Sequence, residues 1–475
     1  MARAANILIF WTLLALASSA AQTVTFKHVV VIVQENRTPD NMFGSNPNFE
    51  PGVDIATSGI NSKGEKVPLT PIPLANCYDL GHKHVAFVAA YDNGKMDGAD
   101  KELLSPAPGC AVPANPQYKF VDNSTGEIQP YFDIAKQYGW ANRMFQTNQG
   151  PSFSAHQFFL AGTSAPDTNS KLFASDNPPP GPAGCIAPPG TTVTVVDPDG
   201  DVTTNPGIYP CFEHPTLTDV LNDAGISWKY YAPTAGSIWT APNAIRHMCV
   251  AQGKNGALEC TGPDWVSNVV IGSSQILNDI QECKLAKVNW VMPPSTRASD
   301  HPKNNRGGGP AWVASVVNAI GSNPACPGSG EAYWKDTAIF ITWDDWGGWY
   351  DHVPPFRQGQ PNGWGAGFTY GFRIPLLVVS AYTPAGYVDN SDHDIGSILK
   401  FIETDFAPPG KPLGPIGPGT YADAYADNSL QAFFTLNSPR PFQRIHVKFN
   451  PRLFLQDTAR RVFEEMAGCG MGCWF

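Results

Sequence analysis

Two pairs of adjacent polar residues stand at the ends of apolar segments. Glu35 and Asn36 come shortly after a nearly continuous run of β-branched residues, and Asp344 and Asp345 follow a second apolar run. Adjacent carboxylates repel each other, so a pair at the tip of a buried strand is unfavourable unless a cation offsets the charge. Carboxylate and amide oxygens suit a hard divalent ion. The two pairs therefore predict a metal site; the alternative is that they are exposed loop residues or helix caps.

Ser152 is the candidate nucleophile. It immediately precedes an apolar helical stretch, residues 153–161, which places it at or next to a helix N-terminus. The free N–H groups and the dipole of a helix favour an anion and a deprotonated hydroxyl there. A metal in contact with the serine oxygen would lower the hydroxyl pKa further, so no Ser-His-Asp triad is required. The alternative is that Ser152 or Ser154 only caps the helix, as serines in this context commonly do.

Three histidines lie in loop-like segments close to these residues or after predicted strands. They are His82, His301 and His352. Histidines in such positions are candidates for phosphate binding or acid–base chemistry, although a single surface histidine usually has no function.

The elements that must position these residues form an alternating pattern. Buried strands are predicted at residues 26–33, 288–292, 337–342 and 374–380. Amphipathic helices are predicted at residues 131–138, 153–161, 216–224, 310–320 and 394–404. Buried strands between amphipathic helices indicate an α/β sheet with helices on both faces. Such sheets bind ligands just beyond the carboxyl ends of their strands, where the polar pairs lie.

Residues 1–21 predict a cleaved signal peptide. Arg3 gives a basic start, residues 7–17 are almost entirely apolar, and residues 18–21 are small. This apolar core is too short for a permanent membrane helix, although an uncleaved anchor is the alternative. We expect a secreted or periplasmic protein with no integral membrane segment after signal removal, whose residues 22–475 form one domain.

Charge and cysteine content narrow the partners. The net charge of −10 argues against nucleic acid, because proteins that bind it concentrate positive charge, and against simple electrostatic adhesion to anionic membranes. The ten cysteines are scattered without CxxC spacing. In an exported chain this predicts disulfides, which we expect to join mostly sequence neighbours.

Three longer motifs carry a family resemblance. Residues 35–44 read ENRTPDNMFG, close to E-N-R-S-F-D-x-x-F-G, and residues 150–156 read GPSFSAH, close to G-P-S/T-x-P-N-R/H. Residues 344–353 read DDWGGWYDHV, close to D-E-x-G-G-x-Y-D-H-V. Shorter matches lie at residues 93–98, 299–302 and 371–375. In this order the motifs resemble the bacterial phosphoesterase family that contains phosphatidylcholine-type phospholipases C and a group of acid phosphatases.

The resemblance implies an alkaline-phosphatase-like α/β fold, with a mixed, mostly parallel sheet between helices and long loop insertions. It implies a metal-dependent phosphate-ester hydrolase that acts through a serine nucleophile, Ser152, and a phosphoseryl intermediate. One divalent metal of open identity would be held by Glu35, Asn36, Ser152, Asp344 and Asp345. His82 and His301 match histidines that contact the phosphoryl group, and Asp351 and His352 match motif residues that act in or orient the site.

Departures from the family pattern leave several alternatives open. Asp345 replaces a glutamate, Ser154 and Ala155 replace Pro-Asn, and residues 410–475 form a C-terminal extension without a match. The resemblance implies a phosphate-ester substrate and leaves open whether it is a monoester or a diester, with a phospholipid as one candidate. Aromatic residues around the acidic motif either pack or receive a choline headgroup by cation–π contact; they are Trp343, Trp346, Trp349 and Tyr350. The competing function is a catalytically inactive surface or binding protein on the same scaffold.

Overall fold

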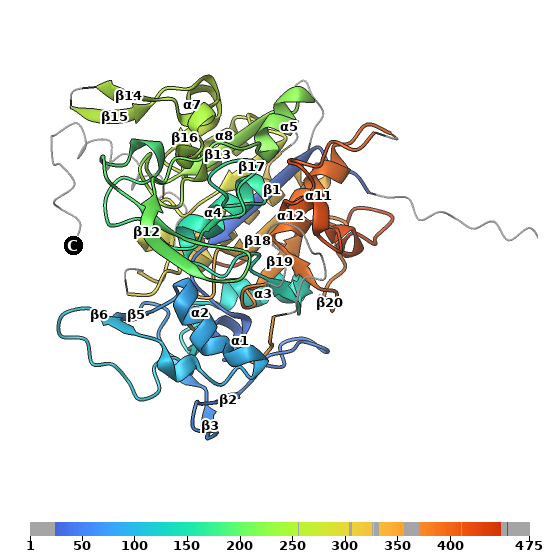
Figure 1. The fold of residues 1–475 in the computed structure, drawn as a ribbon. Helices are drawn as coiled ribbons and strands as arrows, with labels where there is room; N and C mark the ends of the chain where they lie inside the picture. Colours follow the sequence, from blue (N-terminus) through green and yellow to red (C-terminus); the bar gives the residue numbers. More distant parts are fainter. Residues whose placement is uncertain are drawn as a thin grey trace, which may run out of the picture.

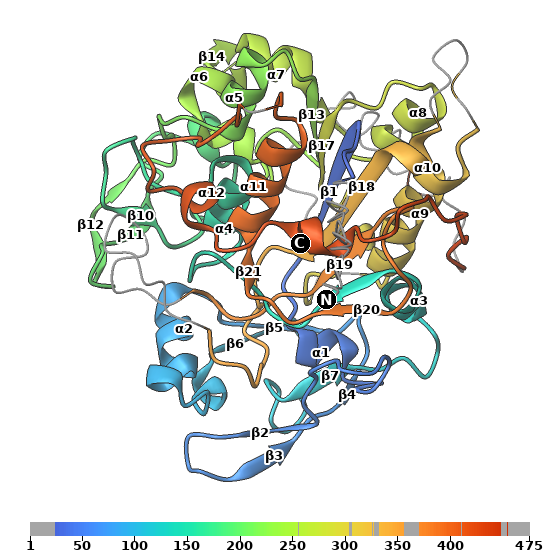
Figure 2. The same cartoon turned by 90° about the vertical axis from the view of Figure 1, so that its right-hand side faces the viewer.

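An eight-stranded sheet runs through the centre of the computed structural model, between two groups of helices (Figures 1 and 2). The structure describes residues 24–254, 256–303, 306–324, 326, 332–355, 370–409, 411–447 and 454. In spatial order the strands are β16 (Val269–Ile271), β13 (Trp228–Ala232), β17 (Val288–Val291), β1 (His28–Gln34), β18 (Thr337–Trp343), β19 (Leu376–Val379), β8 (Gly139–Ala141) and β20 (Tyr387–Asp389).

The sheet is mixed and mostly parallel, as the sequence predicts. Strands β16, β13, β17, β1 and β18 pair in parallel, and so do β8 and β20. Strand β19 runs antiparallel to both of its neighbours, β18 and β8. The predicted strands at residues 26–33, 288–292, 337–342 and 374–380 correspond to β1, β17, β18 and β19.

The central strands β1 and β18 are buried along their whole length. This agrees with their continuous apolar sequence, which is typical of strands covered on both faces. Their register pairs His28 with Thr337 at one end and Gln34 with Trp343 at the other. The two strands therefore end side by side, and the residues that follow them must emerge at the same edge of the sheet.

Helices cover both faces of the sheet (Figure 2). One group comprises α3 (Gln129–Gln137), α8 (Gln275–Gln281), α9 (Gly309–Ser322) and α10 (Tyr333–Asp336). The other comprises α4 (Ser152–Ala161), α5 (Leu217–Asp223), α11 (Ile395–Asp405) and α12 (Ala422–Tyr425). The five predicted helices coincide with α3, α4, α5, α9 and α11. Local signals fix their starts: a proline lies in the first turn of α9, and Asp394 and Ser397 form a capping box at α11.

A long N-terminal insertion lies beyond the carboxyl end of β1, where Figure 2 shows it in blue below the sheet. Its elements include α1 (Pro39–Phe43), β5 (Tyr78–Leu80), α2 (His84–Tyr91), β6 (Leu104–Pro106) and β7 (Lys119–Val121). Strands β5 and β6 pair antiparallel, and the Cys77–Cys110 disulfide closes the loop that contains them.

Four disulfides join Cys77–Cys110, Cys185–Cys211, Cys249–Cys260 and Cys283–Cys326. Each disulfide joins two cysteines that follow each other in the order of cysteines along the chain, which confirms the expected pairing. Cys469, Cys473 and the predicted signal peptide lie outside the described residues. Among the residues that the structure describes, no helix has both the length and the apolar character needed to cross a membrane.

The described part of the C-terminal extension packs against α9 and α10. The main chain of Ile445 exchanges two hydrogen bonds with the side chain of Asn318 on α9. The indole of Trp334 on α10 donates to the carbonyl of Arg440.

Candidate active site

The two polar pairs meet at the carboxyl ends of β1 and β18. The backbone N–H of Asp344 donates to the carbonyl of Gln34, and the N–H of Asn36 donates to Asp344 Oδ1, both at 2.9 Å. The side chains of Glu35, Asn36, Asp344 and Asp345 are fully buried. The structure thus brings the four predicted metal-binding residues together inside the protein.

Two special backbone conformations let the strand ends approach so closely. Asn36 adopts a left-handed conformation with φ of 60°, which asparagine tolerates better than most residues. Gly347 has a φ of 63° and lies so close to Asn36 that a Cβ atom on it would be 2.4 Å from the carbonyl oxygen of Asn36. At Gly348 a Cβ would lie 2.5 Å from Leu80 Cβ. The two glycines therefore allow the acidic loop to press against β1 and β5.

Ser152 is the first residue of α4, after the N-cap Pro151, and its side chain is buried. Its hydroxyl lies 3.3 Å from Asp345 Oδ2 and 3.5 Å from Glu35 Oε2, and donates toward these carboxylates. The helix N-terminus thus directs the candidate nucleophile into the carboxylate cluster.

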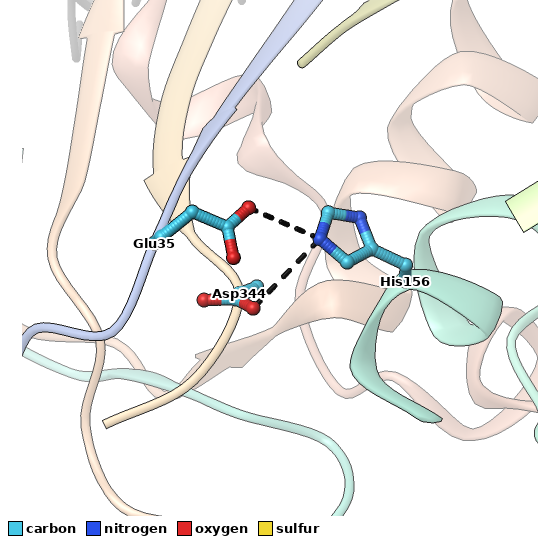
Figure 3. Close-up of side chains that lie close together, drawn as sticks. All are labelled: Glu35, His156 and Asp344. Atoms are coloured by element: carbon cyan, nitrogen blue, oxygen red, sulfur yellow. Dashed lines mark hydrogen bonds and ion pairs between the residues drawn. The ribbon is translucent and has the colours of Figure 1, made fainter. Parts of the chain in front are cut away.

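His156 is a further site residue, and it is not among the residues predicted from the sequence. It lies one helical turn after Ser152, so both side chains leave α4 on the same face. Its Nε2 lies 3.2 Å from Glu35 Oε1 and 3.7 Å from Asp344 Oδ2, as Figure 3 shows. The S-x-x-x-H spacing on a predicted helix is the signal that could have identified it.

Burial and mutual repulsion both oppose ionisation of the three carboxyl groups, those of Glu35, Asp344 and Asp345. Burial raises the pKa of Glu35 well above its usual range, and repulsion from Asp344 raises it further. Burial and the same neighbour also raise the pKa of Asp345. Burial opposes ionisation of Asp344 too, but His156 and several hydrogen bonds hold the pKa of Asp344 below its usual value. In the described part of the chain, histidine is the only basic side chain that pairs with these carboxylates.

This donor set fits a divalent metal ion. Asn36 Oδ1 and Asp344 Oδ2 are buried and have no hydrogen-bond partner, which is unfavourable for oxygens shielded from water. A cation among them would satisfy both atoms and offset the repulsion between the carboxylates. Glu35, Asn36, Ser152, Asp344 and Asp345 could therefore hold the ion that the sequence predicts.

His82 and His301 lie together beside this cluster, with ring centroids 6.4 Å apart. His82 Nδ1 is 2.7 Å from the carbonyl oxygen of Leu80, and its Nε2 is 3.2 Å from Asn36 Nδ2. Burial alone would lower the pKa of His82, but nearby carboxylates, Asp345 first, outweigh it and raise the pKa to about 9. Both predicted phosphate-contacting histidines are thus at the site, His82 in direct contact with it.

The buried guanidinium of Arg37 holds the loop that carries His301. Its Nε and Nη2 donate to the carbonyl of Asp300 at 3.0 and 2.7 Å, and it stacks over the ring of Trp349 at 5.2 Å. Arg37 therefore ties the end of β1 to the loop after β17.

Asp351 and His352 occupy a second cluster. Arg373 donates to both oxygens of Asp351, from Nε at 2.8 Å and from Nη2 at 3.0 Å. His352 Nδ1 lies 2.8 Å from Asp40 Oδ2, and its Nε2 lies 2.9 Å from Asp54 Oδ1. The contacts of this cluster run to Arg373, Asp40 and Asp54 rather than to Ser152. They support an orienting role for Asp351 and His352, whose part in catalysis stays a prediction.

The sequence matches the Phosphoesterase family over residues 26–408, which include both clusters. The chain belongs to the Phosphoesterase family.

Curated relatives carry phospholipase names. The hemolytic phospholipase C of Pseudomonas aeruginosa is 24% identical over 80% of this chain and 52% of its own length. The non-specific phospholipase C1 of Arabidopsis thaliana is 34% identical over 76% of this chain and 62% of its own length. The non-hemolytic phospholipase C of Burkholderia pseudomallei is 31% identical over 40% of this chain and 32% of its own length. The matched region thus spans about half of the Pseudomonas protein and about a third of the Burkholderia protein.

Solved structures with a similar arrangement include a Vibrio parahaemolyticus protein described as a member of the alkaline phosphatase superfamily. It is 11% identical and covers 81% of this chain and 67% of its own, with a TM-score of 0.32. A phosphonate monoester hydrolase of Silicibacter pomeroyi is 12% identical over 66% of this chain and 73% of its own, with a TM-score of 0.28. Sequence identities and TM-scores this low do not indicate the function of this Phosphoesterase family member.

Two departures from the family motifs can be placed in the site. Asp345, where glutamate is usual, still reaches Ser152, because its Oδ1 accepts from the N–H of Gly347 and so directs Oδ2 to the serine. Ser154, in place of proline, turns its hydroxyl to the carbonyl of Pro151 at 2.9 Å and does not point at the carboxylates.

The aromatic residues around the acidic motif are packing residues in this structure. Trp343, Trp346 and Trp349 are almost fully buried, and Tyr350 nearly so. Trp346 packs against Phe87 and Phe372. Of the two readings that the sequence left open, the packing role is the one their burial supports.

Proposed function

We propose that this chain hydrolyses phosphate esters, with Ser152 as the nucleophile and a phosphoseryl intermediate. One observation carries the proposal: the Ser152 hydroxyl, at a helix N-terminus, donates into a buried carboxylate cluster that needs a cation. The proposed metal ligands are Glu35, Asn36, Ser152, Asp344 and Asp345. A bound divalent ion would lower the pKa of the serine hydroxyl and offset charge on a phosphoryl oxygen.

The residues of the chain then divide the remaining work. Ser152 Oγ attacks phosphorus, and the bond between phosphorus and the ester oxygen breaks. Asp345 Oδ2, at 3.3 Å the nearer carboxylate acceptor, is placed to receive the hydroxyl proton. His82, whose Nδ1 is committed to the Leu80 carbonyl, directs Nε2 at the site, where it can contact the phosphoryl group or protonate the leaving alcohol.

The second half of the reaction restores Ser152. Water attacks the phosphoserine and gives a proton to His82, which replaces the one passed to the alcohol. The bond between Oγ and phosphorus breaks, and Asp345 returns the hydroxyl proton to Oγ. His301, edge to face with His82, is positioned to contact the same phosphoryl group. Fixed donors of this kind stabilise charge that develops in the transition state, which is commonly the largest catalytic contribution.

Replacing the nucleophile tests the proposal. Ser152→Ala is expected to lower kcat for a soluble aryl phosphate ester by about 10³-fold or more, because the covalent route is lost. Ser154→Ala is the matched control, since Ser154 is equally buried on the same helix but bonds only local groups. Activity of Ser152→Ala within severalfold of wild type would rule out the assignment, and full inactivity of the folded wild type on all esters would favour a binding protein.

We further propose that the natural substrate is a phospholipid diester, cleaved as by a phospholipase C. Support comes from an apolar rim beside His82, which consists of Val85, Val88, Leu103 and Leu104. Val85 and Val88 are 60% and 53% exposed on α2, and Leu103 is 79% exposed. Clusters of solvent-exposed, large apolar side chains often mark interaction surfaces, including surfaces that insert into lipid.

The rim is joined to the site by short connections. The N–H of Gly81, the residue before His82, donates to the carbonyl of Leu103 at 2.7 Å. The helix that carries Val85 and Val88 begins two residues after His82. An apolar surface so close to the phosphoryl-contacting histidine fits a substrate whose phosphate lies at the face of a lipid layer. The names of the relatives, phospholipase C in bacteria and a plant, agree with this class.

We also propose a secreted or periplasmic location. The four disulfides support it, because disulfides persist in oxidising compartments and are rare in the cytosol.

A further inference from the structure

We propose that His156 Nε2 binds the metal directly, so that the site is a mixed nitrogen–oxygen site selecting a transition ion such as Zn²⁺ or Fe²⁺ over Mg²⁺ or Ca²⁺. The inference rests on the proposed function only in using the same metal site.

The position of the imidazole carries this inference. Figure 3 shows one ring nitrogen of His156 facing Glu35 and Asp344 together. One ligand atom from each of the three residues lies within 4.8 Å of the other two, and all three side chains are fully buried. Three donors that converge in the protein interior form a face on which an ion can bind.

The distances fit shared coordination better than a single hydrogen bond. A ring N–H could donate to Glu35 Oε1 at 3.2 Å, but the 3.7 Å separation from Asp344 Oδ2 is too long for one. Both separations suit neighbouring ligands around an ion with ligand distances of about 2.1 Å. Asp344 Oδ2 also has no hydrogen-bond partner, which is expected of an oxygen atom that coordinates a metal ion.

The helix explains why this residue is available. Ser152 and His156 are four residues apart in α4, so one helix face presents both the nucleophile and the nitrogen donor. Imidazole nitrogen is a good ligand for zinc, iron, copper or nickel, whereas magnesium and calcium prefer oxygen. The extra nitrogen therefore predicts which class of ion the site retains.

The test uses the full chain, freed of metal by a chelator and reloaded with Mn²⁺. Electron spin-echo spectroscopy of the bound ion should show modulation from a directly coordinated nitrogen, which changes to the ¹⁵N pattern in protein labelled with ¹⁵N-histidine. In His156→Gln the modulation should disappear, and the affinity for Zn²⁺ measured by calorimetry should fall at least about 100-fold. In His82→Gln, which removes a second imidazole beside the carboxylates, the modulation should persist.

His214→Gln is the matched control, because His214 is similarly buried but bonds the carbonyl of Pro215 and packs on Tyr421. It should leave both the modulation and the affinity unchanged. Bound Mn²⁺ without histidine modulation in the wild type, or modulation that survives in His156→Gln, would overturn the inference. If His156→Gln fails to fold, modulation lost in His82→Gln overturns it and modulation kept there supports it. Failure of the proposed function would show separately, as full activity in Ser152→Ala.

Discussion

Arg373 holds the second cluster together through its guanidinium group. It is fully buried, binds Asp351 through two nitrogens, and contacts Asp40 at 3.3 Å. It also donates to the carbonyls of Asp54 and Asn142. These bonds join the acidic loop after β18 to α1 and to the segment before β19. Removing a buried charge partner leaves the opposite charge desolvated and unpaired, which is far more destabilising than losing a surface pair.

Arg373→Met is therefore expected to lower the free energy of unfolding by about 3–5 kcal/mol. Arg143→Met is the matched control: Arg143 also pairs with an aspartate, Asp54, but both side chains are partly exposed, so its loss should cost under about 1 kcal/mol. Urea unfolding of the two variants beside wild type measures the difference. A change of less than 1 kcal/mol in Arg373→Met would show that the cluster does not hold the loop.

Among elements, β1 and β18 explain how much of the site the sequence could predict. Their continuous apolar runs identify both as buried strands, and parallel neighbours must end at one edge of the sheet. The convergence of Glu35 with Asp344 follows from that alone. His156 was missed because its partners follow β1 and β18, far away in the sequence, so only the helical spacing from Ser152 and the last position of the 150–156 motif pointed to it. The antiparallel direction of β19 could not be predicted either, because its run of apolar residues is the same in either direction.

Helix α2 gives a prediction at this scale. In Val85→Ser/Val88→Ser, hydrolysis of phosphatidylcholine in vesicles should fall about tenfold or more, because about 2–3 kcal/mol of apolar burial in lipid is lost. Turnover of a soluble aryl phosphate ester should stay within about twofold, since neither valine contacts Ser152. Assaying both substrates with each protein separates lipid docking from chemistry.

The control for α2 is the double variant Val266→Ser/Ile271→Ser. These residues are exposed on α7 (Pro263–Asn268) and β16, at the opposite end of the molecule from α2 in Figure 1. It should leave vesicle hydrolysis unchanged. Equal losses in both double variants, or none in either, would contradict the proposal that the rim meets the lipid.

At the scale of the whole molecule, two carboxyl groups of α11 are buried against other segments of the chain. Glu403 on α11 is buried beside Asp423 of the C-terminal segment, and burial followed by the charge of Asp423 raises the pKa of Glu403 to about 8. Asp405 accepts bonds from the N–H of Phe26, and burial raises its pKa to about 7. The sequence could not predict these environments. Asp405 is buried by Phe26, which is 379 residues away, and Asp423 lies in the C-terminal extension, for which no family motif is recognised.

These groups make the fold less stable as the pH rises. A carboxyl whose pKa is raised on folding binds more protons in the native than in the unfolded chain between the two pKa values. Stability therefore falls with increasing pH across that window, by up to about 1.4 kcal/mol per pH unit for each group. For Glu403 the window runs from about 4, the unfolded value, to about 8. The protein should accordingly be more stable at pH 5 than at pH 8.

Glu403→Gln isolates one contribution, because the carboxylates around Ser152 are the same in both proteins and cancel in the comparison. The variant keeps the shape of the side chain but cannot ionise, so its loss of stability between pH 5 and pH 8 should be smaller than that of the wild type. Urea unfolding at the two pH values measures this, with Glu282→Gln, an exposed partner of Lys284, as the control. An identical pH dependence in wild type and Glu403→Gln would mean that the pair with Asp423 is already relaxed or hydrated in solution, and that the C-terminal segment does not seal it.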